Sequence, residues 1–248
     1  MHKRTKYFLL TAMALIFGGR ARAGPPFLTD DPEPVDYEHW EVYGFATGDR
    51  TNGGDAVSGP AFEANYGAFH DTQLHIAGQV AHVTSNDQPS ATGLGDTELG
   101  VKYRFVHETS EQPQVGVFPA IELPTGDADR GLGNGRAWFR LPLWLQKSFG
   151  PWKTYGGGGV TLNSAPGQRD YRYGGWLVQR DFGSRLTLGG EIFSQGASTA
   201  NGRGFTAFNF GGYFNFTENF SLLFSAGRSF SGERHTVWYL GLYRTGGK

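Results

Sequence analysis

Between Glu98 and Phe105, apolar side chains occupy every odd-numbered position, and Glu, Gly, Lys and Arg occupy the even-numbered ones. From Gln73 onward, most runs of about ten residues show a similar alternation of apolar with small or polar residues. Successive side chains of a β-strand point to opposite faces, so each run has one apolar and one polar face. Such strands suit a position between lipid and a wet interior. The pattern therefore predicts an all-β fold, a transmembrane antiparallel up-and-down β-barrel of the outer-membrane type.

The first 23 residues have the features of a cleaved secretory signal. A basic start at residues 2–6 precedes an apolar stretch from Tyr7 to Phe17, and the segment ends in the small-x-small pattern Ala21-Arg22-Ala23. The apolar stretch is too short to span a bilayer as a helix. We therefore expect residues 1–23 to be a signal peptide, with the mature chain starting at Gly24.

The composition agrees with export to a bacterial outer membrane. The chain has 39 Gly, 20 Phe, 11 Tyr and 6 Trp among 248 residues, yet its mean hydropathy is -0.40. A polar average with many aromatic residues is expected when one face of each strand meets lipid and the other meets water. The formal net charge of -1 gives no basic surplus for nucleic acid, and the absence of Cys excludes disulfides and thiolate metal sites.

About twelve strands are predicted after residue 38, so that residues 39–248 form the barrel; ten or fourteen strands are alternatives. The ranges are His39–Ala46, Pro60–Ala68, Gln73–Val83, Asp96–Phe105, Gln114–Leu123, Arg136–Lys147, Trp152–Leu162, Tyr171–Arg180, Leu186–Ser194, Phe205–Phe216, Ser221–Gly227 and Thr236–Arg244. The weakest of these predictions is Trp152–Leu162, because Gly156–Gly159 interrupts its alternation. Such a run of glycines indicates a bend or a lateral opening in the wall.

The connections between these strands alternate long and short. In outer-membrane barrels, short turns face the periplasm and long loops face outward. Because the first and last connections are long, both termini are expected on the periplasmic side, which requires an even number of strands. The long set is Gly48–Gly59, Ser85–Gly95, Pro124–Gly135, Asn163–Asp170, Gln195–Gly204 and Arg228–His235; the short set is His70-Asp71, His107–Pro113, Ser148–Pro151, Asp181–Arg185 and Thr217–Phe220.

The alternation assigns side chains to the two faces of the wall. The lipid face is predicted to carry Phe62, Ala64, Tyr66, Leu74, Ile76, Val80, Val101, Tyr103, Phe105, Phe139, Leu141, Leu143, Leu145, Phe208, Phe210, Phe214, Trp238, Leu240 and Leu242. Aromatic girdles are expected to draw on Trp40, Trp144, Trp152, Tyr239 and Tyr243. The lumen is predicted to carry Glu63, Asn65, His75, Gln79, Lys102, Arg104, Glu122, Arg140 and Glu191, whose mixed charges favour salt bridges across the lumen.

Three short motifs resemble a known family. They are Pro25–Pro32 (PPFLTDDP), Gly93-Leu94-Gly95-Asp96 followed by Glu98–Tyr103, and Glu122-Leu123-Pro124-Thr125-Gly126-Asp127. Their order and placement resemble the bacterial meta-pathway phenol-degradation-like outer-membrane proteins, over most of the mature chain. The resemblance implies a barrel in the outer membrane that admits hydrophobic substrates. The chain departs from the many barrels that end on an aromatic residue read by the barrel-assembly machinery, because it continues past Tyr243 to Lys248.

Residues 24–38 form an acidic, proline-broken segment that precedes the first strand. Proline at 25, 26, 32 and 34 excludes a helix or a central strand. The segment is either a periplasmic leader or a short strap that folds into the lumen. As a strap and gate, it would bring carboxylates to Lys102, Arg104 and Arg140. The carboxylates in question are Asp30, Asp31, Glu33, Asp36 and Glu38.

These features favour a passive channel for small, hydrophobic or aromatic molecules over two alternatives. The first alternative is a structural or surface-interaction barrel that acts through its long outer loops. The second is a lipid hydrolase at the outer rim, for which His82 and Ser85 are the available pair; three residues apart on a continuing strand, they would point to opposite faces. We expect no catalytic residue, cofactor or metal. The expected partners are outer-membrane lipids, a small solute and, during biogenesis, the assembly machinery; the barrel is a monomer or a homo-oligomer.

Overall fold

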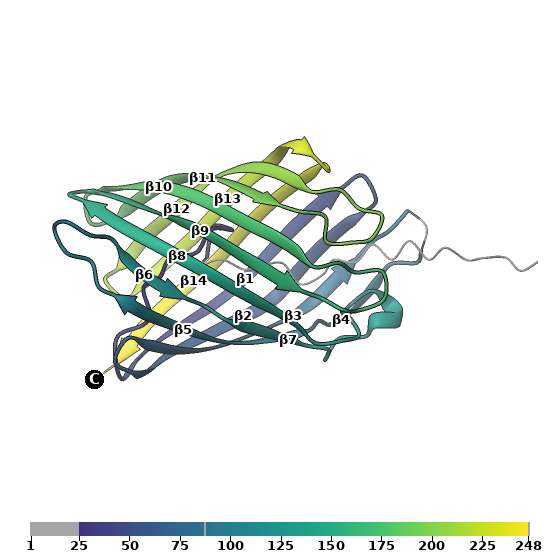
Figure 1. Cartoon of the computed structure of the whole chain (residues 1–248), viewed down its shortest axis with the longest axis horizontal. Coiled ribbons are helices and arrows are strands. Elements are labelled where there is room, and N and C mark those ends of the chain that lie inside the picture. Colours follow the sequence, from purple (N-terminus) through teal and green to yellow (C-terminus); the bar gives the residue numbers. More distant parts are fainter. Residues whose placement is uncertain (1–24, 87, 248) are drawn as a thin grey trace, which may run out of the picture.

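The alternating runs fold into a closed antiparallel β-barrel (Figure 1). The structure is a computed structural model, which describes residues 25–86 and 88–247. The predicted signal peptide lies outside the described residues. The segments are β1 (His39–Thr51), β2 (Asp55–Phe69), β3 (Thr72–Val83), β4 (Ala91–Leu94), β5 (Thr97–Val106), β6 (Gln114–Val117), β7 (Ala120–Leu123), the 3-10 helix η1 (Ala128–Arg130), β8 (Trp138–Phe149), β9 (Trp152–Leu162), β10 (Tyr171–Phe182), β11 (Leu186–Gln195), β12 (Phe205–Thr217), β13 (Phe220–Gly232) and β14 (His235–Gly247).

The fourteen segments make twelve wall strands, which confirms the predicted number. β4 and β5 both pair with β3, and they are separated by Gly95 and Asp96. β6 and β7 both pair with β5 and β8, and they are separated by Phe118 and Pro119. Proline has no N–H to give to a ladder, which explains why the predicted strand Gln114–Leu123 is divided. Pairing of β1 with β14 closes the barrel.

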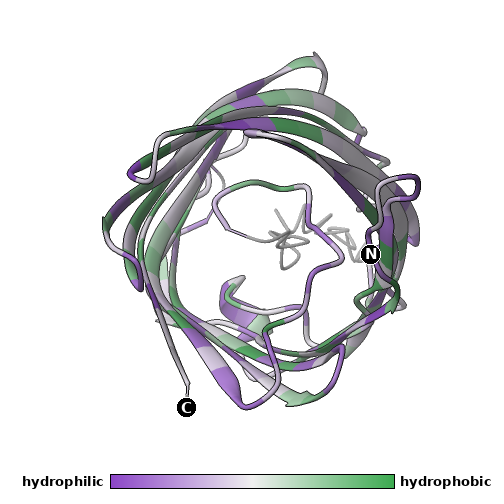
Figure 2. Ribbon diagram, turned by 90° about the vertical axis from the view of Figure 1, so that its left-hand side faces the viewer, coloured by the Kyte–Doolittle hydropathy of each residue, from purple (hydrophilic) through white to green (hydrophobic). Residues whose placement is uncertain are grey.

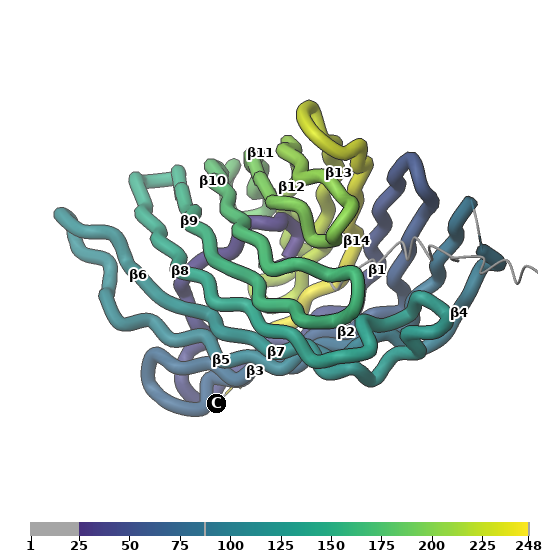
Figure 3. The backbone as a smooth tube through the Cα atoms, turned by 45° about the vertical axis from the view of Figure 1, so that its right-hand side comes forward, coloured from purple at the N-terminus to yellow at the C-terminus, as the bar shows by residue number. Residues whose placement is uncertain are grey.

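Two of the six connections predicted to be long are strands with tight turns. β1 and β2 continue through Gly48–Gly59 and leave only residues 52–54 between them, and β13 and β14 leave only Glu233 and Arg234. Figure 3 shows these hairpins as narrow arches. The extra residues pair with a neighbouring strand, so their backbone groups form ladder hydrogen bonds that a loop would leave to water. Four long loops, 84–90, 124–137, 163–170 and 196–204, share this end of the barrel, here called the loop end; the opposite end is the turn end.

The outside of the wall is an apolar belt. Every residue predicted to face lipid points outward, and most are large and exposed, among them Phe62, Leu141, Phe210 and Leu240, which are 49%, 50%, 65% and 52% exposed. Three of the predicted girdle residues point into the barrel instead: Trp144 and Tyr239 are buried there, and Tyr243 packs against the cluster around Tyr43 and donates to Glu41. Their strands place them at inward positions. The described chain contains no helix long and apolar enough to cross a membrane.

The interior of the barrel contains a segment of the chain itself. Residues 25–38, here called the strap, lie inside the ring of strands, as Figure 2 shows along the barrel axis. The strap ends at the turn end, where the Glu38 N–H donates to the carbonyl of Gly67 at 2.8 Å and β1 begins. Its side chains Phe27, Thr29 and Asp30 are 3%, 0% and 1% exposed. The strap therefore fills the middle of the lumen.

A second segment folds inward at the loop end. Residues 124–137, here called the inward loop, contain η1 and connect β7 to β8. Leu132 at its tip is buried against Ala81 and Ala91. Asp96 accepts hydrogen bonds from the backbone N–H groups of Gly126 at 2.9 Å and Asn134 at 2.7 Å. Two of the sequence motifs thus form a single structure, because the Asp of one orders the loop of the other.

Candidate functional site in the barrel lumen

The strap is anchored to the wall by Glu191 of β11. The Glu191 carboxylate accepts hydrogen bonds from the backbone N–H groups of Leu28 at 2.8 Å and Thr29 at 2.7 Å. The side chain of Asn209 on β12 donates to the same carboxylate at 3.1 Å. The N–H groups of Leu28 and Thr29 have no acceptor in a β-ladder, so they need another one, and a buried carboxylate is a strong acceptor.

Lys102 of β5 holds the next part of the strap. Its ammonium nitrogen lies 3.0 Å from the carboxylate of Asp30 and 3.6 Å from that of Asp31. Both Lys102 and Asp30 are almost completely buried. A buried ion pair adds little to stability when both partners are present. Removing one partner leaves an uncompensated buried charge, which is strongly destabilising. This pair therefore favours one position of the strap over displaced ones.

Towards the turn end, the strap meets β6, β8 and β9. Glu33 accepts hydrogen bonds from Gln146 at 2.9 Å and Gln114 at 3.4 Å, and it lies 3.5 Å from the Lys153 ammonium. Desolvation raises the pKa of Glu33, but Lys153 and the Gln146 hydrogen bond outweigh it, so the net pKa is lowered. The Val35 N–H donates to the side chain of Gln73 on β3 at 2.9 Å. The strap is thus held by polar side chains from several strands.

Of the three cations predicted to meet the strap, Lys102 forms ion pairs with its carboxylates. Arg104 instead donates to Asp71 in the turn after β2, at 3.0 and 2.6 Å, and to Gln114 at 3.0 Å. Arg140 forms an ion pair with Glu98 on β5. Asp71 belongs to the turn between β2 and β3, and Glu98 belongs to β5. Arg104 and Arg140 therefore form their ion pairs with acids outside the strap, and the charge of Arg104 still contributes to lowering the pKa of the strap carboxyl of Glu33.

Glu63 and His75 belong to a buried network that runs between β2 and β8. Glu63 accepts from the side chain of Asn65 at 2.9 Å, and Asn65 lies 2.8 Å from His75 Nδ1. His75 Nε2 is 3.1 Å from the carboxylate of Glu98, which also pairs with Arg140. All the predicted lumen candidates point inward: Glu63, His75, Lys102, Arg104, Glu122, Arg140 and Glu191. Asp36 lines a cavity beside the strap at the turn end.

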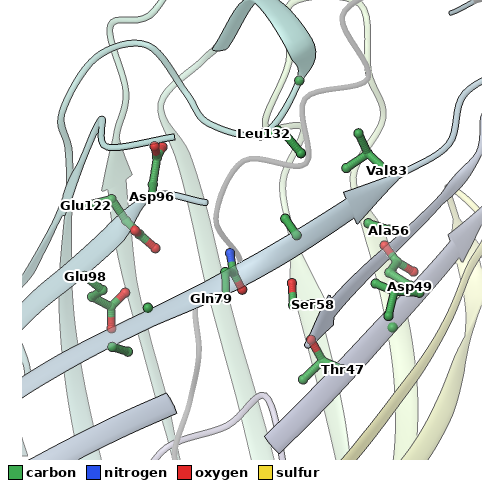
Figure 4. Close-up of a pocket in the computed structure, with 16 residues that line it drawn as sticks. Thr47, Asp49, Ala56, Ser58, Gln79, Val83, Asp96, Glu98, Glu122 and Leu132 are labelled. Atoms are coloured by element: carbon green, nitrogen blue, oxygen red, sulfur yellow. The ribbon is translucent and has the colours of Figure 1, made fainter. Parts of the chain in front are cut away.

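Two cavities lie on either side of the strap. One, at the loop end, has a volume of about 80 Å³ and is lined by β1, β2, β3, β5, β7 and the inward loop. Figure 4 shows Asp49, Glu98 and Glu122 around it, with Leu132 above. The other, of about 220 Å³ at the turn end, is lined by the strap and by the turn residues His70, Asp71 and His107. The two share no lining residue, and of the two only the turn-end cavity is lined by strap residues.

Aromatic side chains line much of the interior, and the sequence analysis did not predict them there. Phe118, Trp144, Tyr173 and Phe193 form one buried cluster, on which Leu28 of the strap packs. A second cluster contains Tyr43, Phe45, Ala61, Leu223 and Tyr239. Their odd or even positions along the strands could have predicted this, because each of them falls on the inward-facing side of the alternation. The lumen is consequently less charged and more aromatic than predicted.

The pair considered for a lipid hydrolase is arranged otherwise. His82 Nδ1 lies 2.7 Å from the hydroxyl of Thr92 on β4, and Ser85 belongs to the loop 84–90. The imidazole thus has a hydrogen bond across the β3–β4 ladder, where the two residues are direct partners. This is the role of a polar wall residue.

Comparison with known proteins identifies relatives of this architecture. The family model described as "Putative MetA-pathway of phenol degradation" matches residues 45–244. No curated protein matches the chain.

Three solved structures show the same fold. The COG4313 outer membrane channel from Pseudomonas putida F1 is 16% identical with a TM-score of 0.65, covering 86% of this chain and 99% of that one. The NanC porin is 7% identical with a TM-score of 0.55, covering 83% and 98%. The translocator domain of the autotransporter NalP from Neisseria meningitidis is 10% identical with a TM-score of 0.54, covering 85% and 89%. With its apolar exterior and closed wall, the chain is an outer-membrane β-barrel, and it belongs to the phenol-degradation family whose model it matches.

Proposed function

We propose that the protein is an outer-membrane channel for the passive uptake of small hydrophobic or aromatic molecules, with the strap as its gate. The observation that carries this proposal is the strap across an aromatic lumen, with a cavity at each end of the barrel. The description of the family as phenol degradation supports an aromatic solute, and the similar fold of an outer membrane channel supports passage through the barrel.

The contacts of the strap suit a gate because most of its anchors are wall side chains rather than a backbone ladder. Glu191, Lys102, Gln146 and Gln73 can each keep a hydrogen-bonding partner in water once the strap leaves. The strap could therefore move out while the wall ladders remain paired. A bulky plug with its own strands would have to break ladder hydrogen bonds to do the same.

We further propose that the turn end faces the periplasm and the loop end faces outward, so that both termini of the mature chain are periplasmic. The four long loops at one end support this orientation. An epitope inserted in loop 196–204 should be labelled on intact cells, and one inserted at Gly150-Pro151 should be labelled only after the outer membrane is permeabilised. Labelling of the second insertion on intact cells would reverse the orientation.

The function itself is tested by conductance and solute flux. Refolded full-length protein and a variant lacking Thr29–Tyr37 are compared in planar bilayers and in liposome swelling with a small aromatic solute. The deletion is expected to raise both conductance and swelling, because it removes the residues that fill the middle of the lumen. A deletion of similar length in loop 196–204 serves as the control and should leave both unchanged.

The same experiment separates transport from the alternative functions. A folded deletion variant without conductance or solute flux would reject the channel and favour a structural or surface-interaction barrel. Heat-modifiable migration on gels shows whether the variant is folded. Lipid hydrolysis that depends on Ser85 would reject the proposal in favour of an enzyme at the rim.

A further inference from the structure

Phe27 of the strap occupies a slot in the wall that is complementary to an aromatic ring. Its side chain is 3% exposed and packs with Tyr155 of β9 and Leu177 of β10. Tyr155 and Leu177 are direct partners across the β9–β10 ladder, and Leu177 faces Glu191 across the β10–β11 ladder. The slot is therefore built by side chains of three neighbouring strands of the wall.

Two wall hydroxyl groups flank the slot and donate to the strap backbone. The Tyr213 hydroxyl of β12 donates to the carbonyl oxygen of Pro25 at 3.0 Å. The Ser225 hydroxyl of β13 donates to the carbonyl oxygen of Pro26. The strap thus presents to the wall one aromatic ring next to two oxygen acceptors. When the strap leaves, an apolar slot and two hydroxyl donors are exposed together.

We propose that this slot is a binding site for a small, neutral, oxygen-bearing aromatic solute, and that the strap occupies it as an internal competitor. The ring of such a solute replaces Phe27 against Tyr155 and Leu177, and its oxygen accepts from Tyr213 or Ser225. Phenols and aryl aldehydes or ketones have this chemistry. The neighbouring Glu191 carboxylate disfavours an aromatic carboxylate, because like charges in a lumen of low dielectric repel strongly.

The inference rests on the proposed function and adds selectivity to it. A solute that binds the wall only when the strap is out shifts the population towards the open strap. Opening should then depend on the concentration of the solute and should saturate. A solute that merely diffuses past the strap would show neither property.

The test uses the absence of cysteine from the natural sequence. The variant Thr29→Cys places a single thiol on a strap residue that is 0% exposed. Its rate of labelling by a water-soluble maleimide is measured on refolded protein with phenol, with benzene and with cyclohexanol. Phenol should raise the rate about tenfold or more if the open strap is otherwise a minor state. Benzene lacks the oxygen and cyclohexanol lacks the aromatic ring, so both should act more weakly.

Matched variants decide whether the slot is responsible. In Phe27→Ala, labelling of Cys at position 29 should be fast without phenol and should no longer depend on it, since the competitor is gone. In Tyr213→Phe, the labelling rate with phenol should exceed the rate with benzene by a smaller factor than in the parent variant. A Ser58→Cys variant reports on the loop-end cavity instead, and its labelling should not respond to phenol.

Two results would overturn the proposal. One is an effect of phenol that persists undiminished in Phe27→Ala. The other is equal acceleration at positions 29 and 58, which would mean a general loosening of the barrel. If phenol has no effect while the Thr29–Tyr37 deletion still raises conductance, the slot is rejected and the gate stands. If neither has an effect, the proposed function fails as well.

Discussion

The strap and the inward loop both fold into the lumen, but they are held in different ways. The strap, residues 25–38, is continuous with the wall at β1, and it is held elsewhere by side chains such as Glu191 and Lys102. The inward loop, residues 124–137, is continuous with β7 at one end and β8 at the other. In each segment one carboxylate fixes two backbone N–H groups, that of Asp96 in the inward loop and that of Glu191 in the strap, so the difference lies in the chain connections.

This difference assigns the two segments different roles. A segment held by separate side chains can exchange its contacts for water one by one, whereas a loop fixed at both ends moves only within a small volume. The strap therefore has the properties of a movable gate, and the inward loop those of a permanent wall of the loop-end cavity.

Reversing the charge of Lys102 should release the strap. In Lys102→Glu, the buried carboxylate of Asp30 loses its partner and meets a like charge, which should weaken strap docking by about 3–5 kcal/mol. Open probability in planar bilayers should rise towards that of the Thr29–Tyr37 deletion. The matched control is Lys147→Glu, which breaks an ion pair with Glu108 at the turn end. Equal effects of the two reversals would mean that the strap is not held by Lys102.

The gate requires a wall that stays intact when the strap moves. Replacing Leu141, Leu143 or Phe210 with Arg should cost about 2–4 kcal/mol of unfolding free energy, since each side chain faces lipid near the middle of its strand. Gln79→Arg, on the lumen side, should cost little. Guanidinium unfolding in lipid vesicles measures both. Equal costs would contradict the assignment of the two faces.

Loosening the inward loop should leave the strap unaffected. Asp96→Ala leaves the N–H groups of Gly126 and Asn134 without their acceptor, at a cost of about 1–3 kcal/mol each where they are buried. Hydrogen exchange should increase within residues 124–137 and should not change within residues 25–38. An increase in both segments would show that they are coupled, against the distinction drawn above.

The smallest expected effect is that of acid on the strap. The pKa of Glu33 is lowered in the folded state. Its contribution to strap docking is therefore complete above the ordinary pKa of a Glu carboxyl and is lost as the pH falls through the lowered pKa. Opening should therefore increase below about pH 4, where a Glu carboxyl begins to be protonated. Glu33→Gln should remove this component from the pH profile. A profile that is identical in the variant would exclude Glu33 as its source.

The sequence predicted the wall better than it predicted the lumen. Alternation sets which side chain faces lipid, because a strand has only two faces, and residues such as Leu141 and Phe210 were assigned correctly. The same rule, applied to Trp144 and Tyr239, would have placed them inside. They were assigned to girdles because Trp and Tyr near strand ends are frequent there. That assignment ignored the alternation of inward and outward positions.

Contacts inside the lumen could not be predicted to the same degree. The pairing of Asp30 with Lys102 was expected from charge, but Arg104 and Arg140 form their ion pairs with acids outside the strap, Asp71 in a turn and Glu98 on β5. Register and barrel stagger decide such choices, and neither is encoded in the alternation of one strand. The tight hairpins at residues 52–54 and 233–234 escaped prediction for a related reason, since their Gly-rich and Ser-rich flanks resemble loops.

The most direct test of the central claim is to lock and unlock the strap in one molecule. A Cβ atom built on Gly175 of β10 would overlap the Thr29 hydroxyl, so the two positions are in direct contact, and a small backbone shift brings cysteines there to the Cβ–Cβ separation of about 3.5–4.5 Å that a disulfide prefers. Thr29→Cys with Gly175→Cys should show no openings in planar bilayers when oxidised, and reduction should restore them in the same membrane. The conductance of each single-cysteine variant should not change when the reductant is added. Unchanged conductance before and after reduction, with the disulfide shown to form, would contradict the account of the strap as a gate.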